Sequence, residues 1–528
     1  MAATKKDEGQ KPNIIRPLGN VECYEFHMLE LKFLGGTIVN CRYTVPVSLA
    51  APGLHDRVVA RVEDALARAV LEHPALRHEV IDADARRPAW VAVNEVDFAH
   101  HVQWEDVNEE DTSSAVSYGE MLRERIEKLL NQPPARIPGQ PQWRVIVLFK
   151  KGEKPFLDIV FVYSHALGDG TSGKIFHQTL LRLLNASAAT PEKEAETETP
   201  VSTLANRVLR IPSAARPLAP PIEKVSKFPL SAKFAITTAW RELLPPGLAS
   251  LRPSHAHWAP IRPTPFRTRL RVFDIERGVL RGILAASRSH KTTVTGLLHA
   301  LLLASMASHI PPSDATAFVG STALDLRRHV SELGPGLDPK RTMADYVSQM
   351  THEFDVDLVR DVREDVDGGD GGDGALSPAL VSLIWQCATR VRSEIQKRLD
   401  QGLKNDLVGL MKLVPDWRAQ FRTEASKARP YSFVVTNLGV LDGAETKTGK
   451  EAERKNGDSP VTENWTAEHS VFAISTEVCG AAFQVSPISV RDGALCVSCS
   501  WQDCVVDVKL GEAIVADLER WLRFLGRS

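Results

Sequence analysis

Apolar residues recur along the chain with two different periods, and the clearest pattern lies between residues 143 and 163. WRVIVLFK (143–150) and FLDIVFVY (156–163) are apolar, β-branched runs separated by the polar turn KGEKP. Such runs predict two buried strands joined as a β-hairpin. The second strand ends at Tyr163, so it leads directly to His165 in a glycine-rich turn that opens the next helix.

Apolar residues at helical spacing predict amphipathic helices on both sides of this hairpin. Before it they occur from His55 to Pro74 and over 121–131; after it they run from Ile175 to Leu184, with Thr171 or Ser172 as the N-cap. A strongly apolar helix capped by Thr292 or Thr293 runs through Ala307, and a long helix or helix pair starts at Leu380. The last helix carries an apolar stripe whose simplest role is packing: Ile514, Leu518, Trp521, Leu522 and Leu525.

Further strands are predicted near 37–45, 78–82, 90–104, 269–275, 317–325 and 431–436. We expect the strands near Trp90 and over 98–104 to continue the first sheet. We also expect 469–478, 481–490 and 494–501 to be successive antiparallel strands.

Two polar segments interrupt these patterns. ATPEKEAETETPVS (189–202) is acidic, and RIPSAARPLAPPIEK (210–224) is rich in proline. A chain of 528 residues also exceeds the roughly 250 to 300 residues that one core serves. We therefore predict an α/β (α+β) protein with a disordered leader (1–13), a first domain (14–190), a crossover (191–265) and a second domain (266–528).

Composition excludes several classes of protein. With 64 basic and 66 acidic residues, the net charge of −2 gives no field that would attract nucleic acid. The first twelve residues lack the apolar core of a secretory signal, and no run approaches the roughly 18 apolar residues of a membrane span. The seven cysteines are odd in number and lie mostly in apolar segments, as reduced thiols do. We expect a cytoplasmic protein.

Two short motifs resemble metal sites without the context that such sites need. Cys496 and Cys499 form a C-x-x-C, but only Cys504 follows instead of a second pair. GGDGGDGAL, from Gly368, fits one calcium β-roll repeat, whereas stacking needs about three. We predict a loop there and no metal.

The candidate chemistry lies in the turn after Tyr163, which reads His-x-x-x-Asp-Gly with His165, Asp169 and Gly170. A neutral imidazole takes a proton from a hydroxyl or amine near pH 7, because its ordinary pKa is about 6.5. Asp169 can fix the turn by pairing with a cation elsewhere, and Gly170 allows close approach. A lone histidine after a strand is nevertheless more often structural than catalytic.

The same turn has a second interpretation. From Gly168 to Lys174 it reads G-x-x-x-x-G-K, the phosphate-binding loop of nucleotide hydrolases except for the last position. That position needs a Ser or Thr hydroxyl for magnesium, and here it is Ile175. A P-loop-like nucleotide hydrolase is therefore an alternative.

Taken together, several motifs resemble the acyl-CoA-dependent acyltransferase superfamily, which includes chloramphenicol acetyltransferase, the plant BAHD acyltransferases and the condensation domains of peptide synthetases. The chain most resembles its fungal alcohol acetyltransferase family. The resemblance spans nearly the whole chain and is carried by RPLGNVE (from Arg16), HPAL (His73), QWRVIVL (Gln142), SHALGDG (Ser164), TTVTGLLHALLLA (Thr292), LDLRR (Leu324) and TNLG (Thr436).

This resemblance implies two chloramphenicol acetyltransferase-like subdomains, each a mixed sheet flanked by helices, with a channel at their interface. His165 would be the general base between acetyl-CoA, or a similar acyl-CoA cosubstrate, and a hydroxyl or amine of a small hydrophobic acceptor. Asp169 would pair with Arg327, or with Arg328 as second choice. Thr436 and Asn437 are weaker candidates for binding the thioester carbonyl oxygen.

Two features depart from relatives. Ser164 precedes His165 where several relatives have a second histidine, and the Asp-Phe-Gly-Trp-Gly motif of the plant enzymes is absent. We expect a monomer without a bound cofactor or a nucleic-acid partner. Besides the nucleotide hydrolase, a catalytically inactive homologue that only binds a ligand is an alternative.

Overall fold

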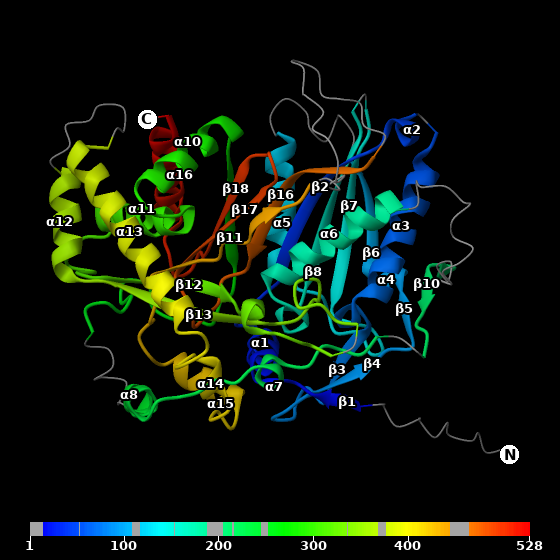
Figure 1. The fold of residues 1–528 in the computed structure, drawn as a ribbon, viewed down its shortest axis with the longest axis horizontal. Helices are drawn as coiled ribbons and strands as arrows, with labels where there is room; N and C mark the ends of the chain where they lie inside the picture. Colours follow the sequence, from blue (N-terminus) through cyan, green and yellow to red (C-terminus); the bar gives the residue numbers. More distant parts are fainter. Residues whose placement is uncertain are drawn as a thin grey trace.

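The computed structural model describes residues 14–527 except 52, 108–116, 153, 187–203, 214, 215, 244–251, 335, 368–375 and 444–463. The predicted leader, the polar loop 447–460 and most of the glycine-rich loop 364–377 lie outside the described residues. The described strands form two large mixed sheets and two small antiparallel ones (Figure 1).

A five-stranded sheet carries the predicted hairpin at its centre. Its order is β16 (Thr466–Ile474), β2 (Thr37–Thr44), β8 (Phe156–Tyr163), β7 (Trp143–Lys150) and β6 (Val102–Val107). The hairpin is confirmed, since β7 and β8 pair antiparallel from Trp143 opposite Tyr163 to Lys150 opposite Phe156. β6 pairs parallel to β7, which makes the sheet mixed. β8 is almost completely buried, as expected for a continuous apolar run.

Helices α3 (His55–Glu72) and α6 (Gly170–Ala186) pack against each other, and α6 also contacts β2 and β16. The helix α5 (Tyr118–Leu130) contacts β2, β16 and β11 and so touches both large sheets. The predicted N-cap of α6 was wrong. Asp169 caps the helix instead, because its Oδ1 accepts a hydrogen bond from the Ser172 backbone N–H at 2.9 Å, and aspartate is as good a cap as serine.

Two small sheets replace the predicted continuation of the first sheet. β3 (His78–Ile81) and β4 (Ala89–Ala92) join β1 (Ile14–Pro17), in the order β1-β4-β3. β5 (Glu95–Asp97) pairs with β10 (Val208–Arg210), which pairs with β9 (Leu204–Ala205). The expectation that the strand at Trp90 extends the large sheet was therefore wrong. Two short strands, β9 and β10, lie within the range predicted as a crossover.

A seven-stranded sheet occupies the second part of the chain. Its path is β11 (Thr268–Ile275), β18 (Leu495–Gln502), β17 (Phe483–Val490), β14 (Phe433–Val435), β12 (Phe318–Asp325) and β13 (Val347–Phe354), with β15 (Gly439–Leu441) beside β17. Its helices are α10 (Arg277–Ser289), α11 (Val294–His309), α12 (Val356–Asp367), α13 (Pro378–Asp400) and α16 (Val508–Arg527). Thr293 caps α11, as expected. The apolar stripe of α16 is buried, which confirms its packing role.

The strand β16 does not join its neighbours in sequence. It pairs antiparallel with β2 over Thr466–Ile474, so a strand from near the end of the chain completes the five-stranded sheet. Only β17 and β18 pair antiparallel as predicted. β2 otherwise leaves one edge unpaired, and covering that edge with β16 satisfies its backbone groups.

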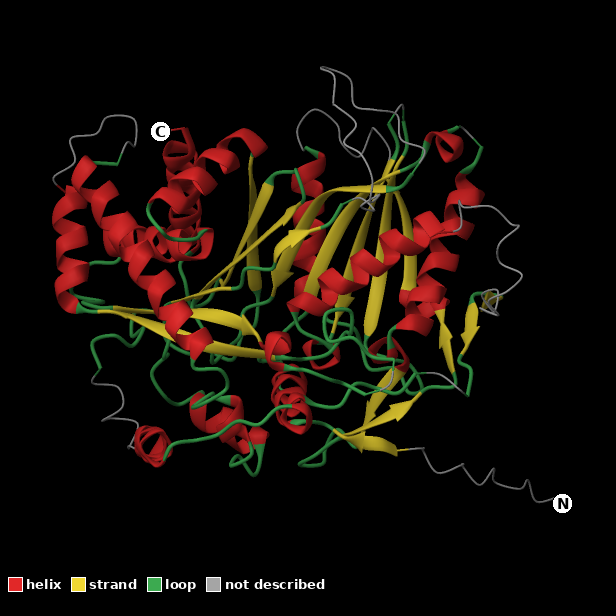
Figure 2. Cartoon of the chain, viewed as in Figure 1, coloured by secondary structure: helices red, strands yellow, loops and turns green. Residues whose placement is uncertain are grey.

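Between and below the two large sheets lie short elements and one buried helix (Figures 1 and 2). The buried helix is α1 (Asn20–Glu30), which the hydrophobic pattern did not predict. The remaining elements are α2 (Val47–Ala50), η1 (Pro74–Arg77), α4 (Phe98–His101), η3 (His165–Leu167), α7 (Ile222–Val225), α8 (Ala232–Leu243), η5 (Leu326–His329), α14 (Val408–Met411) and α15 (Trp417–Glu424). Among the described helices, none combines the length and hydropathy of a membrane-spanning helix.

Candidate active site

His165 is the first residue of η3, the single 3-10 turn between β8 and α6. Because β8 is central and fully packed, the end of the strand fixes the start of this turn. The His165 side chain is 10% exposed. The residue is thus almost buried, with a small part of the ring left accessible.

Asp169, just before α6, and Arg327, on η5, form a buried ion pair. Nη1 of Arg327 donates to Oδ2 of Asp169 at 2.6 Å, and both side chains are about 95% buried. Burial opposes ionisation of Asp169, but Arg327 and the backbone N–H groups of Tyr346 and Ser172 hold the pKa of this carboxyl below its ordinary value. Asp169 therefore stays ionised and joins the turn after β8 to η5.

The same network holds the segment before β13. The Ala344 carbonyl oxygen accepts from Nη2 of Arg327 at 2.8 Å and from the Ser172 hydroxyl at 2.9 Å. The Tyr346 N–H donates to Oδ2 of Asp169 at 3.0 Å. Residues 344 and 346 are thus fixed on both sides of Asp345.

Acidic groups from separate elements converge on His165. Nδ1 of the imidazole lies 3.7 Å from Oδ1 of Asp345 and 3.9 Å from Oε2 of Glu25 on α1. Among the described residues, this nitrogen, Oε2 of Glu25 and both Asp345 oxygens are buried without a hydrogen-bond partner. These atoms form a polar cluster inside an apolar surrounding.

The protonation of this cluster is set by burial together with the charges that face one another. Burial alone would lower the pKa of His165, but the facing Glu25 and Asp345 carboxylates raise it to about 10. Burial raises the pKa values of Glu25 and Asp345 above their ordinary range, while the imidazole acts in the opposite direction. Glu477, just after β16, also has a raised pKa because of burial.

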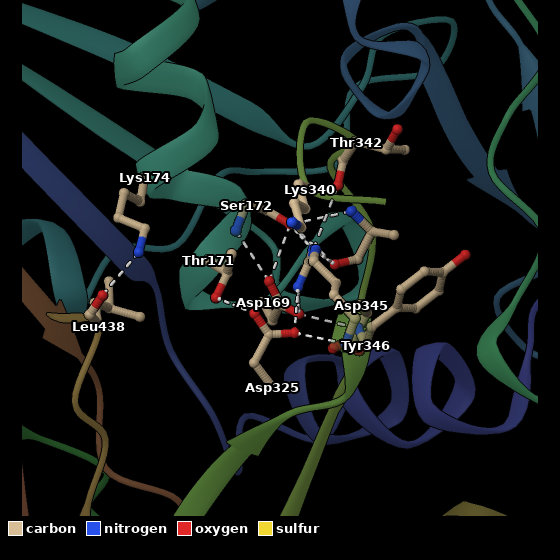
Figure 3. A network of polar contacts seen from close by, with 12 residues as sticks. Asp169, Thr171, Ser172, Lys174, Asp325, Lys340, Thr342, Asp345, Tyr346 and Leu438 are labelled. Carbon is tan, nitrogen blue, oxygen red and sulfur yellow. Dashed lines mark hydrogen bonds and ion pairs between the residues drawn. The ribbon is translucent and has the colours of Figure 1, made fainter. Parts of the chain in front are cut away.

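Gly170 is needed for close approach between the two large sheets. A Cβ built there would lie 2.7 Å from Cδ2 of Leu438 and 2.8 Å from Cζ of Phe472. Neighbouring Lys174 donates from Nζ to the Leu438 carbonyl at 2.8 Å (Figure 3). The glycine and the lysine thus fit α6 against the segment after β14.

Several backbone amides of this turn are already bonded within the protein, whereas a phosphate-binding loop presents its amides to the ligand. The Gly168 N–H donates to the His165 carbonyl, the Asp169 N–H to the Ala344 carbonyl, and the Ser172 N–H to Asp169. Lys174 is also engaged with Leu438. These contacts weigh against the nucleotide hydrolase.

The contacts made by the other predicted site residues lie outside the imidazole cluster. Arg328 is exposed, and the partner of Asp169 is Arg327. The Thr436 hydroxyl bonds to the Ser486 hydroxyl at 2.7 Å. The exposed Asn437 amide donates to Thr295 at 3.0 Å, and its oxygen accepts from the Gly439 N–H. Both polar side chains are thus already engaged with their own surroundings.

Sequence reasoning missed Glu25 and Asp345. Glu25 lies between Tyr24 and Phe26 on a helix that is buried on most sides, and a carboxylate in such a helix is itself a signal. Asp345, in TMADYV, carries no comparable signal, because a single aspartate before a strand is ordinary.

Within the part of the chain that the structure describes, two groups of side chains have possible metal-ligand atoms within 4.8 Å of one another: Glu25, His165 and Asp345, and Asp274, His469 and Cys496. In the first group, the distances of 3.7 and 3.9 Å between Nδ1 of His165 and the carboxylate oxygens fit an imidazolium that faces two carboxylates. In the second, burial raises the pKa of the Cys496 thiol, which disfavours the thiolate that metals bind. Cys496 and Cys499 are three residues apart on β18 and so point to opposite faces. We assign no metal to either group.

A cavity of about 610 Å³ lies beside β13 and α13. Its lining includes Gln349, Glu394, Lys397, Arg398 and Tyr431, and His165 is not part of it. The candidate site is therefore the cluster of polar groups around His165 and not this cavity.

Comparison with solved structures defines the class of fold. TRI3 trichothecene 15-O-acetyltransferase from Fusarium sporotrichioides superposes with a TM-score of 0.66, at 13% identity, over 96% of this chain and 95% of that one. The structure of F. sporotrichioides TRI101 complexed with coenzyme A and T-2 gives 0.54, at 15% identity, over 96% and 98%. The predicted acyltransferase and condensation-domain fold class is confirmed.

Sequence comparisons then point to the family. The alcohol acetyltransferase family model matches residues 92–322. "Probable alcohol acetyltransferase FCK4" of Fusarium pseudograminearum (strain CS3096) is 26% identical over 99% of this chain and 98% of that protein. "Probable alcohol acetyltransferase crmB" of Aspergillus fumigatus is 27% identical over 70% and 69%. These matches support the alcohol acetyltransferase family as the family of this chain.

Proposed function

We propose that this protein transfers an acetyl group from acetyl-CoA to a hydroxyl or amine of a small hydrophobic acceptor, with His165 as general base. The observation that carries this proposal is the position of His165. Its imidazole lies at the end of the central strand β8, faces Glu25 on α1 and Asp345 just before β13, and keeps part of its surface accessible. The coenzyme A named with the TRI101 structure supports an acyl-CoA cosubstrate.

In this mechanism Nε2 of neutral His165 takes the proton of the acceptor hydroxyl while the oxygen attacks the thioester carbonyl. The C–S bond then breaks, and the imidazolium returns the proton to the leaving thiolate of coenzyme A. No covalent enzyme intermediate forms. Asp169 takes no direct part in the proton transfer, because its carboxylate is paired with Arg327.

The thioester oxygen needs a donor as negative charge develops on it. Thr436 and Asn437 remain the candidates, at the end of the β14 strand. Asn437 would have to release Thr295 to serve, and Thr436 would donate from its pair with Ser486. The channel implied by the resemblance is part of this proposal.

The test is an assay of coenzyme A release with acetyl-CoA and a panel of alcohols and amines, with the acylated product identified by mass spectrometry. We expect His165→Ala to lower kcat about 10²- to 10⁴-fold, the usual contribution of a general base. Its circular dichroism spectrum should stay unchanged.

The matched control is His100→Ala, since the His100 side chain is 51% exposed and away from the cluster. It should keep full activity. If no acceptor yields product, or if His165→Ala turns over as fast as the unaltered protein, the proposed function is wrong. Phosphate release from ATP by the same preparation would instead favour the nucleotide hydrolase.

A further inference from the structure

The acidic groups around His165 arrive from distant parts of the chain. Glu25 belongs to α1, Asp345 precedes β13, and Glu477 follows β16. The first two face the same ring nitrogen, Nδ1, at 3.9 Å and 3.7 Å. A buried carboxylate without a partner costs several kcal/mol, so the convergence of two of them on one nitrogen requires a reason.

Asp345 has little freedom to point elsewhere. Its neighbours are bound to the Asp169–Arg327–Ser172 network: Ala344 through its carbonyl oxygen and Tyr346 through its N–H. The Ala344 N–H also donates to the Ser172 hydroxyl at 3.0 Å. Through Asp169, the His-x-x-x-Asp-Gly turn thus holds the backbone around Asp345. The Asp345 carboxylate in turn faces His165, the histidine of the same turn.

Glu25 is held by a well-anchored helix. Glu22 caps the start of α1 by accepting from the Gly19 N–H at 2.6 Å and receives two hydrogen bonds from Arg16. α1 also packs directly against η3, the turn that contains His165. The side of the helix that bears Glu25 therefore faces the imidazole.

We propose that Asp345 and Glu25 are positioning residues that hold a proton on Nδ1 of His165 and so leave the Nε2 lone pair for the acceptor. The proposal rests on the proposed function, since it assigns how that base is prepared. When Nε2 takes the acceptor proton, the O–H bond breaks and an imidazolium forms between the carboxylates. The proton then leaves with the thiolate sulfur of coenzyme A.

The charge around the ring fixes the expected pH dependence. The groups that face it are Glu25, Asp345, Asp169 and Glu477, with Arg327 already paired to Asp169. Each negative charge favours the imidazolium, so the pKa of His165 lies above the ordinary value of about 6.5. His165 therefore becomes neutral, and able to act as a base, only as the pH rises. Removing one carboxylate should let it lose its proton at a lower pH.

The experiment compares the unaltered protein with Asp345→Asn and Glu25→Gln, which keep side-chain size and remove charge. NMR of isotope-labelled histidine follows the titration of His165, assigned by its loss in His165→Ala. In parallel, kcat/KM is measured against pH with the acceptor found in the assay above. For Asp345→Asn, we expect the NMR titration and the kcat/KM profile both to move at least one pH unit toward lower pH. The plateau of kcat/KM should also be about 10- to 10³-fold lower, because the wrong tautomer of His165 is populated. Glu25→Gln should move the same way by less.

Glu332→Gln is the matched control, because Glu332 is an exposed carboxylate in the same connection between η5 and β13. It should change neither titration. Unchanged NMR titrations in both Asp345→Asn and Glu25→Gln would overturn the proposal, as would a shifted NMR titration with an unshifted rate profile. A profile that moves on adding EDTA would also overturn it, because a bound cation would then set the protonation. The NMR titration of His165 tests this proposal even if no acyl transfer is found.

Discussion

At the scale of single residues, the Asp169–Arg327 ion pair is the contact on which the candidate site depends. It is buried on both sides and supplies the hydrogen bonds that fix residues 344 and 346. Buried pairs add little net stability when formed, but breaking one leaves a charge without a partner. Losing Asp169 therefore leaves the buried Arg327 with only the partly exposed Asp325 as an acidic partner.

We expect Asp169→Asn to lower the free energy of unfolding by about 3 to 5 kcal/mol, measured by chemical denaturation at pH 7. Because the pKa of Asp169 is lowered in the folded state, its stabilisation is present above the unfolded pKa and is lost as the pH falls through the folded one. The variant should therefore also lose stability less steeply in acid.

Asp325→Asn is the control for this pair. Asp325 also faces Nη1 of Arg327, at 3.2 Å, but its side chain is 42% exposed. An exposed pair contributes about 1 kcal/mol or less. Equal losses in the two variants would contradict the dominant role of the buried contact.

The sequence predicted part of this site because part of it is local. His165, Asp169 and Gly170 lie within six residues, between a strand and a helix that their own patterns predict. Glu25 and Asp345 are separated by most of the chain and meet only through the fold. Nothing in either local pattern specifies the partner.

At the scale of elements, the packing of α10 on α16 depends on one glycine. A Cβ built at Gly282 would lie 1.9 Å from the carbonyl oxygen of Gly526, a backbone atom that cannot turn away. The two helices must therefore move apart to admit any side chain. Gly278, one turn earlier on the same helix, has open space around its position.

We expect Gly282→Ala to destabilise the protein by about 1 to 3 kcal/mol or more through overpacking. Gly278→Ala should be neutral or stabilise it by up to about 1 kcal/mol, because alanine favours helix. Thermal unfolding of the two variants measures this difference. A loss of equal size in both would show that helix propensity, rather than contact between the helices, decides the outcome.

Elements with a strong local period were predicted well, and their partners less so. The β7–β8 hairpin and the start of α11 follow from short patterns. The place of β4 in a small sheet and the pairing of β16 with β2 depend on residues far away in the sequence. α1 was missed since a helix that is buried nearly all round lacks an amphipathic period.

At the scale of the whole molecule, the second part of the chain supplies one strand to the five-stranded sheet of the first part. β16 comes from the second part of the chain and pairs with β2, while α5, from the first part, contacts β11. The five-stranded sheet is therefore not completed by its own stretch of sequence, and the seven-stranded sheet packs against a helix from the first part.

We expect residues 14–265 expressed alone to aggregate or to lack a cooperative unfolding transition, because β2 is then an unpaired edge strand. The matching fragment 266–528 should behave alike, and coexpression should recover soluble complex. Attaching 464–478 to the first fragment through a flexible linker is the control, and it should improve solubility. A monomeric, cooperatively folded 14–265 would refute this dependence.

The pairing of β2 with β16 also imposes a delay during biosynthesis, because β2 is made long before its partner. Thr37 lies opposite Ile474, so 437 residues separate the partners. At about 5 to 20 residues per second, a ribosome needs roughly 20 to 90 s between making the two strands. For that time the nascent first sheet carries an open edge, so newly made chains should rely on chaperones until synthesis is almost finished.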